Sequence, residues 1–455
     1  LAGRPGAPVP AAGTEDRWPV AAGDGAPVAA SSHGGTLAGG AAWTAPVPDD
    51  WNGTLVLYSH GFRQGPANPA RDEGFDAAAY ALLATGYAIA SSSYAGLGWA
   101  LGTAVRDQLD TLAAFSAAAG KPERTIAYGV SMGGLVSSRL AEIPDAGIDG
   151  AVSTCGVLGG GLNLANLQLD GTYAAAALLL PGENVQLAGF SSAGQAGKTA
   201  DRLRAAVQQA QQSAQGRARI ALVAALLNLP AWHPDSSRPE PADYAAQQEA
   251  RYRWLVEILP LVMASRAELA KAAGGDSAWN EGVDYGAIFE ESGQRAEVEH
   301  LYRQADLHLA ADLAALTAGA DTAPDPGAVD WMSRTSTLTG RLQVPVLTMH
   351  TVADMISPVE QQELYAGSVR RAGAGQYLRQ LYVERAGHCA FSTSERVAAV
   401  AAMGQSLELG RWTGSTDSAA INGFAESLGL GQARFTGYRP DPFINDRTAP
   451  APARQ

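Results

Sequence analysis

The 455-residue sequence has only two cysteines, Cys155 and Cys389. Two cysteines can form one disulfide and are too few for a cysteine-rich metal site. Long apolar runs are absent as well: the longest, around residues 220–227, falls far short of the roughly 18 residues that span a bilayer. We therefore expect no membrane span, no metal site and no cofactor.

Clusters of basic residues are also missing. The formal net charge is −13, and no run of Lys or Arg stands out. Nucleic acids and anionic membrane surfaces attract basic proteins, so neither is expected as a partner. Apolar residues make up 46% of the chain and charged residues 17%, which is enough apolar material for a large core.

The start of the chain lacks the basic segment and apolar stretch of a signal peptide. Residues 1–10 are instead small and rich in Pro and Gly, which is typical of a mature N-terminus left after cleavage. This pattern predicts a secreted protein. We expect residues 1–35 to be a flexible segment and residues 438–455 to be an extended tail.

Short apolar, β-rich runs recur along two parts of the chain and are separated by helix-like segments. The expected strands are alternating residues in 36–47, then 53–61, 86–94, 124–131, 147–156, 344–354 and 377–388. The expected helices between them are 76–85, 103–120 and 135–143. Strands that alternate with helices predict right-handed crossovers and a mostly parallel sheet.

The alternation stops between residues 157 and 335, where the pattern becomes helical. Candidate helices there are 200–215, 219–229, 243–259 and 294–318, with Pro260 among the prolines expected to interrupt or end helices. The sequence thus predicts an α/β core of residues 36–156 and 336–437 with a helical insertion at 157–335.

A G-x-S-x-G match, Gly129-Val130-Ser131-Met132-Gly133, follows a predicted strand directly and precedes a predicted helix. A tight strand-to-helix turn of this kind lifts a serine hydroxyl above the edge of a sheet. The motif alone is weak in a chain with 52 glycines, and a glycine-rich turn with an idle serine is the alternative. Its context favours Ser131 as a nucleophile.

A serine hydroxyl needs a base, and the sequence offers seven histidines. His388 follows the last predicted strand, beside a glycine that allows a tight loop, and is the candidate base. Asp354 follows the preceding strand and is the candidate carboxylate that orients the histidine. Glu384 is the rival acid, although its place within a strand predicts that it points across the sheet.

Two backbone N–H groups are expected to stabilise an oxyanion. One belongs to Met132, which follows the nucleophile, and the other to Phe62, in the loop after the strand at 53–61. His60 is expected to order that loop without transferring protons.

In this combination the sequence resembles the α/β-hydrolase fold. The resemblance rests on "SHGF" (59–62), "GVSMGG" (129–134), Asp354 and "GHC" (387–389), in the order nucleophile, acid, histidine. The stretch "VPDDWNGTLVLYSHGF" (47–62) is similar to secreted actinobacterial hydrolases of this fold. The resemblance implies that the insertion follows the sixth strand and forms a helical cap over Ser131.

The leading functional hypothesis is a serine hydrolase that cleaves carboxylic esters through an acyl-enzyme, with a small-molecule or polymeric ester as substrate. A peptidase or amidase would use the same triad, and a charged group such as Glu290, Glu291 or Asp306 would then hold a peptide terminus. The sequence also leaves open an acyltransferase or a binding module on an inactive scaffold. The apolar stretch 220–229 could line the substrate pocket or be ordinary core.

Cys155 ends the strand that follows the serine, and Cys389 directly follows His388. In a parallel sheet both positions fall at the carboxyl edge, where active-site loops gather. We predict a disulfide between them that tethers the loop of His388; two unpaired buried cysteines are the alternative.

Overall fold

The computed structural model describes residues 28–65, 67–190, 192–448 and 450. One nine-stranded sheet organises the chain, in the order β1-β2-β4-β3-β5-β6-β7-β8-β9. The strands are β1 (Ala30–Thr36), β2 (Ala42–Pro48), β3 (Thr54–Ser59), β4 (Ala88–Ser92), β5 (Arg124–Val130), β6 (Gly150–Thr154), β7 (Val346–Ala353), β8 (Leu378–Ala386) and β9 (Phe435–Thr436). Strands β3 to β8 pair in parallel, whereas β1, β2 and β9 run antiparallel to their neighbours.

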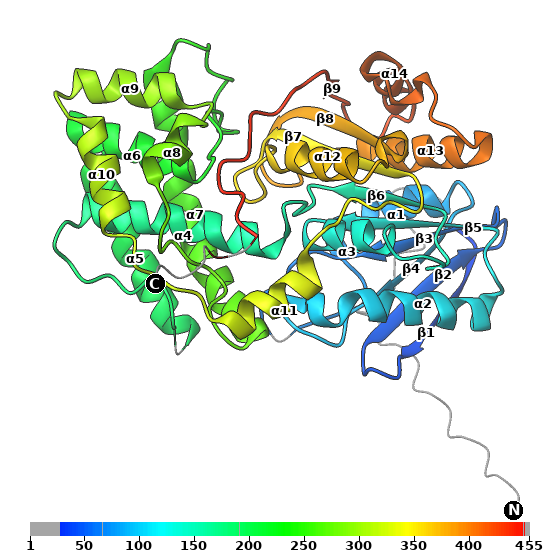
Figure 1. Ribbon diagram of the computed structural model, residues 1–455. Coiled ribbons are helices and arrows are strands. Elements are labelled where there is room, and N and C mark those ends of the chain that lie inside the picture. Colours follow the sequence, from blue (N-terminus) through cyan, green and yellow to red (C-terminus); the bar gives the residue numbers. More distant parts are fainter. Residues whose placement is uncertain (1–27, 66, 191, 449, 451–455) are drawn as a thin grey trace, which may run out of the picture.

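Helices cover both faces of this sheet (Figure 1). The helices of the core are α1 (Asp76–Leu83), α2 (Ala104–Ala119), α3 (Met132–Leu140), α12 (Gln361–Arg371), α13 (Thr393–Leu409) and α14 (Ser418–Ser427). One apolar cluster joins α2, α3 and α12 to the sheet, and another joins α1, α13 and α14 to it. Strand β3 is buried along its whole length, as expected of a strand covered on both faces. The predicted α/β class is confirmed.

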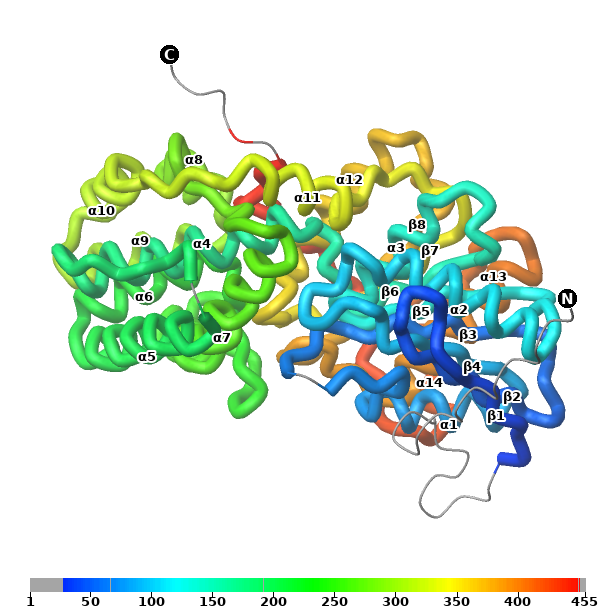
Figure 2. Tube along the Cα trace, turned by 90° about the horizontal axis from the view of Figure 1, so that it is seen from below, coloured from blue at the N-terminus to red at the C-terminus, as the bar shows by residue number. Residues whose placement is uncertain are grey.

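A second group of helices lies between β6 and β7 in sequence and beside the sheet in space (Figures 1 and 2). These are α4 (Gly160–Leu179), α5 (Ala193–Ala210), α6 (Ala214–Leu226), α7 (Tyr244–Ala273), α8 (Tyr285–Glu290), α9 (Arg295–Gln304), α10 (Leu309–Ala318) and α11 (Pro326–Ser336). They have an apolar cluster of their own, which includes the C-terminal half of α6, residues 220–226. We call residues 157–335 the helical insertion.

Three sequence expectations for the helical insertion were wrong. Pro260 does not end a helix but lies inside α7. Leu259 and Val262 beside it are buried in the core of the insertion, and this packing outweighs the roughly 3 kcal/mol cost of an internal proline. The expected helix at 294–318 is two helices, separated by a turn at Asp306 with a φ of 54°.

The third error is α4, which was not among the candidate helices. Nearly all of its residues are buried, polar ones such as Asn163, Asn166 and Asp170 included, so the helix has no solvent-exposed face and lacks the amphipathic pattern that marks a surface helix.

The termini differ from expectation in detail. Residues 30–35, expected to be flexible, belong to β1, which pairs with β2 across Ala30–Thr36. The rest of the expected flexible segment, 1–27, lies outside the described residues. The described part of the C-terminal tail has no regular element, yet it packs on the helical insertion: Arg447 pairs with the buried Asp170 of α4 at 2.7 Å.

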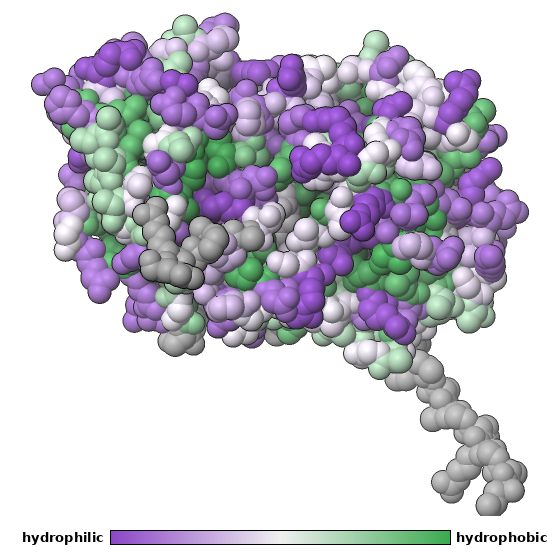
Figure 3. Space-filling view, viewed as in Figure 1, coloured by the Kyte–Doolittle hydropathy of each residue, from purple (hydrophilic) through white to green (hydrophobic). Residues whose placement is uncertain are grey.

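The surface in Figure 3 carries hydrophilic side chains over most of its area, and apolar side chains show mainly in its recesses. Among the described residues, no helix combines the length and apolar character needed to cross a bilayer.

Candidate active site

Ser131 lies in a strained turn between β5 and α3. Its backbone has φ 57° and ψ −120°, a conformation that non-glycine residues rarely adopt. Its N–H donates to the carbonyl of Thr154 on β6, at 2.9 Å. A Cβ on Gly129 would overlap the carbonyl oxygen of Gly133, and a Cβ on Gly133 would overlap that of Ser59. Both glycines of the motif are therefore required by close backbone approach.

A chain of hydrogen bonds connects Ser131 to His388 and Asp354. The Ser131 hydroxyl donates to His388 Nε2 at 2.8 Å, and His388 Nδ1 donates to Asp354 Oδ2, also at 2.8 Å. The two bonds require the neutral tautomer with its proton on Nδ1. The structure thus brings together the three residues that the sequence singled out, from the ends of β5, β7 and β8.

Asp354 is buried and held by several donors. Its Oδ1 accepts the backbone N–H groups of Ile356 and Ser357, at 2.8 and 2.9 Å. Burial by itself would raise the pKa of Asp354, but the positive charge of His388 when it is protonated, and hydrogen bonds from His350 and His388, lower this pKa well below its usual range. Asp354 is therefore a permanent anion beside the imidazole.

His350 lies beside Asp354 and supports it, a role that the sequence did not indicate. Its Nδ1 accepts from the Gln362 side chain at 3.0 Å, and its Nε2 donates to the Ser357 carbonyl at 2.7 Å and lies 3.4 Å from Asp354 Oδ2. These contacts fix the tautomer and hold the loop that carries Asp354. The only signal in the sequence was its position in an apolar stretch predicted to be a strand, and a histidine in a strand is usually structural.

The rival acid Glu384 is exposed and pairs with Arg238 at 3.0 Å, so it lies outside this chain of hydrogen bonds. Glu290, Glu291 and Asp306, considered for a peptide terminus, are exposed and do not line the cavity at Ser131.

His60 lies at the end of β3 and is stacked on Tyr94, with ring centroids 4.1 Å apart. Its Nδ1 faces the Gly61 carbonyl at 2.7 Å and its Nε2 faces the Ser93 carbonyl at 3.1 Å. Burial and the nearby Arg63 lower the pKa of His60 to about 4, so the ring is neutral at pH 7 and donates only one of the two bonds. It joins the β3 and β4 loops, and its ring hydrogen bonds among the described residues go to Gly61 and Ser93, not to His388.

The cavity at Ser131 has a volume of about 160 Å³ and lies between the sheet edge and the helical insertion. Apolar side chains make up most of its lining. The lining residues are Phe62, Trp99, Ser131, Met132, Val157, Leu164, Leu167, Gln168, Leu227, Ile258, Leu261, Val262, Ser265, Met355, Ile356 and His388. None of them is Lys, Arg, Asp or Glu. Leu227, at the end of the apolar stretch 220–229, is the part of that stretch that reaches the cavity.

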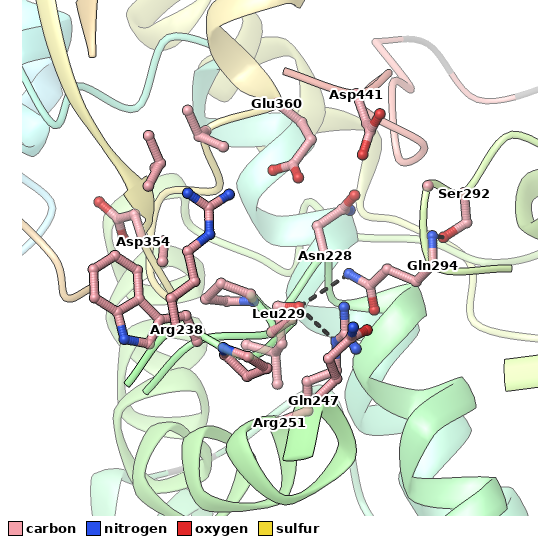
Figure 4. A pocket seen from close by; sticks show the side chains of 18 of the residues that line it. Asn228, Leu229, Arg238, Gln247, Arg251, Ser292, Gln294, Asp354, Glu360 and Asp441 are labelled. Carbon is pink, nitrogen blue, oxygen red and sulfur yellow. Dashed lines mark hydrogen bonds between the residues drawn. The ribbon is translucent and has the colours of Figure 1, made fainter. Parts of the chain in front are cut away.

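A larger cavity, of about 320 Å³, has Asp354 in its lining (Figure 4). Charged and amide side chains surround it, with Glu360 and Asp441 at one end and Gln247 and Arg251 at the other. Neither the serine nor the histidine of the hydrogen-bonded chain lines it, so its greater volume does not make it the reaction site.

Cys155 and Cys389 form a disulfide, with Cα atoms 5.2 Å apart. The predicted pairing is confirmed, and the alternative of two free thiols is excluded. Together with His388, these cysteines are the described residues close enough for a metal site, but bonded sulfurs are not thiolate ligands.

The strand order, the crossovers and the three side chains at the carboxyl ends of β5, β7 and β8 define the class: the protein is a serine hydrolase with the α/β-hydrolase fold. Among curated proteins, the chain is similar to the o-phthalyl amidase of Xanthobacter agilis, with 28% identity over 441 residues that cover 90% of this chain and 94% of the relative. No protein-family model matches the sequence.

Among solved structures, an esterase of Pyrococcus furiosus aligns with a TM-score of 0.38 and 12% identity over 88% of this chain and 98% of its own. Feruloyl esterase B of Aspergillus oryzae aligns with a TM-score of 0.37 and 14% identity, over 84% and 80% of the two chains.

Proposed function

We propose that this protein hydrolyses carboxylic esters and amides with a compact, uncharged acyl group, through an acyl-enzyme at Ser131. The observation that carries the proposal is the 2.8 Å contact of Ser131 Oγ with His388 Nε2 at the wall of an apolar cavity. Ser131 Oγ attacks the carbonyl carbon while its proton passes to His388. The imidazolium then protonates the leaving alcohol or amine, and a water, deprotonated by the same histidine, releases the acid.

The backbone N–H groups of Met132 and Phe62 are the proposed oxyanion donors. Met132 is the first residue of α3, where N–H groups have no partner within the helix. A Cβ on Gly61 would lie 3.2 Å from Ser131 Cβ, so the following residue, Phe62, is near the nucleophile. No hydrogen bond between described residues uses either amide. Both are therefore free to bind a developing negative charge.

The cavity favours a compact and neutral acyl group. Its volume of about 160 Å³ is close to that of an engineered apolar cavity of about 150 Å³ that admits benzene. A carboxylate inside this cavity would lose hydration without meeting an Arg or Lys, which is costly. We therefore propose a benzoyl-sized or short aliphatic acyl group as the preferred substrate part.

Amide cleavage enters the proposal through the similarity to an amidase. Esters and amides require the same triad, because both pass through a tetrahedral oxyanion and differ in the leaving group that His388 must protonate. Acyl transfer differs only in the nucleophile that attacks the acyl-enzyme.

The helical insertion is the proposed cap that selects substrates. Leu164 of α4, Ile258 of α7 and Leu227, just after α6, line the cavity opposite the sheet edge. We also propose secretion, which the disulfide supports because such bonds persist in oxidising compartments.

Matched substrates test the function. We expect 4-nitrophenyl benzoate and acetate to be hydrolysed faster than the long-chain palmitate, and 4-nitrobenzanilide to report amide cleavage. Added hydroxylamine competes with water for the acyl-enzyme, so the yield of hydroxamate relative to free acid measures acyl transfer against hydrolysis. The proposal would be contradicted if the Ser131→Ala variant still hydrolysed these substrates, or if the wild-type protein preferred long acyl chains.

A further inference from the structure

One polar pair interrupts the apolar wall that α4 and α7 form over the cavity; we call this wall the roof. Gln168 of α4 and Ser265 of α7 both line the cavity with Ser131 and His388. The Gln168 Nε2 donates to Ser265 Oγ at 2.9 Å, and Ser265 Oγ donates to Gln168 Oε1 at 3.2 Å. The pair therefore joins the two helices across the roof.

The surroundings of this pair are apolar. Leu164 and Leu167 precede Gln168 on α4, and Leu261 and Val262 precede Ser265 on α7; all four line the same cavity. Gln168 is only 6% exposed. A Leu–Ala pair would fill such a wall without burying polar atoms, and replacing both partners of a buried hydrogen bond by apolar groups of similar shape is often nearly neutral for stability. Stability thus gives no reason for a polar pair here.

The pair also has hydrogen-bonding capacity left over. A glutamine amide offers two N–H donors and an oxygen with two lone pairs, and the contact with Ser265 uses one of each. These two side chains make no further hydrogen bond with the described residues. One amide donor and one acceptor therefore remain beside the cavity, in surroundings that make an added hydrogen bond strong.

We propose that Gln168 and Ser265 bind a neutral substituent that both donates and accepts a hydrogen bond, a hydroxyl group above all, on the acyl part of the substrate. The proposal rests on the acyl hydrolase function proposed above and narrows its substrate class to hydroxylated compact acyl groups. Apolar contacts in the rest of the cavity hold the ring or short chain of the acyl group. Gln168 and Ser265 hydrogen-bond the hydroxyl at the end of the acyl group that lies away from the carbonyl. Sites that hydrogen-bond a substrate hydroxyl discriminate strongly against analogues that lack it, because their own polar groups are then left unpaired.

The experiment compares 4-nitrophenyl esters of benzoic acid with those carrying a hydroxyl or a methyl group at the meta or para position. We expect a hydroxyl-to-methyl ratio of kcat/KM of about ten or more for at least one position, since one added hydrogen bond of about 1.4 kcal/mol corresponds to a factor of ten. In the double variant Gln168→Met/Ser265→Ala this ratio should fall to about one, because the loss of kcat/KM falls mainly on the hydroxylated esters, and the thermal unfolding temperature should stay close to wild type.

Gln208→Met is the matched control, because Gln208 is exposed on α5 and does not line the cavity. It should leave the ratio unchanged. Equal ratios in wild type and double variant, or an equal loss of rate on all of these esters, would overturn this inference alone, provided that hydrolysis depends on Ser131. A complete lack of Ser131-dependent hydrolysis would overturn the proposed function as well.

Discussion

Cys389 is bonded to Cys155 and directly follows His388, so the disulfide fixes the loop of His388 to the end of β6. The two cysteines are 234 positions apart, and the loop that they close includes the whole helical insertion. The covalent link thus connects the strand after the serine turn to the loop that carries His388.

Removing this link should lower activity and stability together. We expect Cys155→Ala/Cys389→Ala to reduce kcat, because the loop of His388 loses its tether, and to lower the unfolding free energy. A loop of this length nominally contributes about 5 kcal/mol in the chain-entropy model. Activity assays and thermal unfolding with and without reductant measure both effects, and two titratable thiols in the unreduced enzyme would contradict the bond.

Ser131→Ala and His388→Ala should each lower kcat by about 10⁴–10⁶, since members of a triad act as a unit. The fold should persist, because neither change creates a large cavity. A fluorophosphonate probe followed by peptide mapping should place the label on Ser131. Labelling of another serine, or a fully active alanine variant, would refute the assignment.

Asp354→Asn should lower kcat by about 10⁴ with little change in structure. An asparagine cannot stabilise the imidazolium, and its amide group favours the wrong tautomer of His388. Glu384→Gln is the matched control, because this carboxylate is exposed and paired with Arg238; its activity should stay near wild type. An equal loss in both variants would argue against the assigned role.

The backbone of Gly133 lies so close to Gly129 that adding a single methyl group at Gly129 should disrupt folding. Gly129→Ala should abolish soluble, active enzyme, because the Cβ would meet the backbone of Gly133. Gly423→Ala, in the middle of α14 with open space around its Cα, should instead stabilise by up to about 1 kcal/mol. Expression yield and chemical unfolding distinguish the two outcomes.

His60 predicts a pH dependence of stability. Its pKa is about 4 in the folded chain and about 6.5 in an unfolded one. Between these values the unfolded state binds more protons, so stability rises with pH across this window and is lost as the pH falls from 6.5 towards 4. The loss should reach up to about 3 kcal/mol. In His60→Gln, which keeps an N–H donor and does not titrate, urea unfolding at several pH values should show a shallower slope; an unchanged slope would contradict the assignment.

Local sequence patterns determined much of this protein. The apolar runs that became β3 and β5 predicted a buried parallel sheet, because strands covered on both faces need apolar side chains throughout. The order of Ser131, Asp354 and His388 after successive strands was also readable, since the carboxyl ends of parallel strands meet at one edge. The same argument predicted the bond between Cys155 and Cys389.

Only the tertiary structure decided the rest. Buried α4 has no solvent-exposed face to give an amphipathic pattern, and α7 continues through Pro260 because packing on both sides outweighs the lost hydrogen bond. The meeting of Gln168 with Ser265 depends on how α4 and α7 pack, and nothing within either helix encodes that partner. Sequence patterns report which face of an element is buried, whereas contacts between elements that lie far apart in the chain arise from the packing of the whole fold.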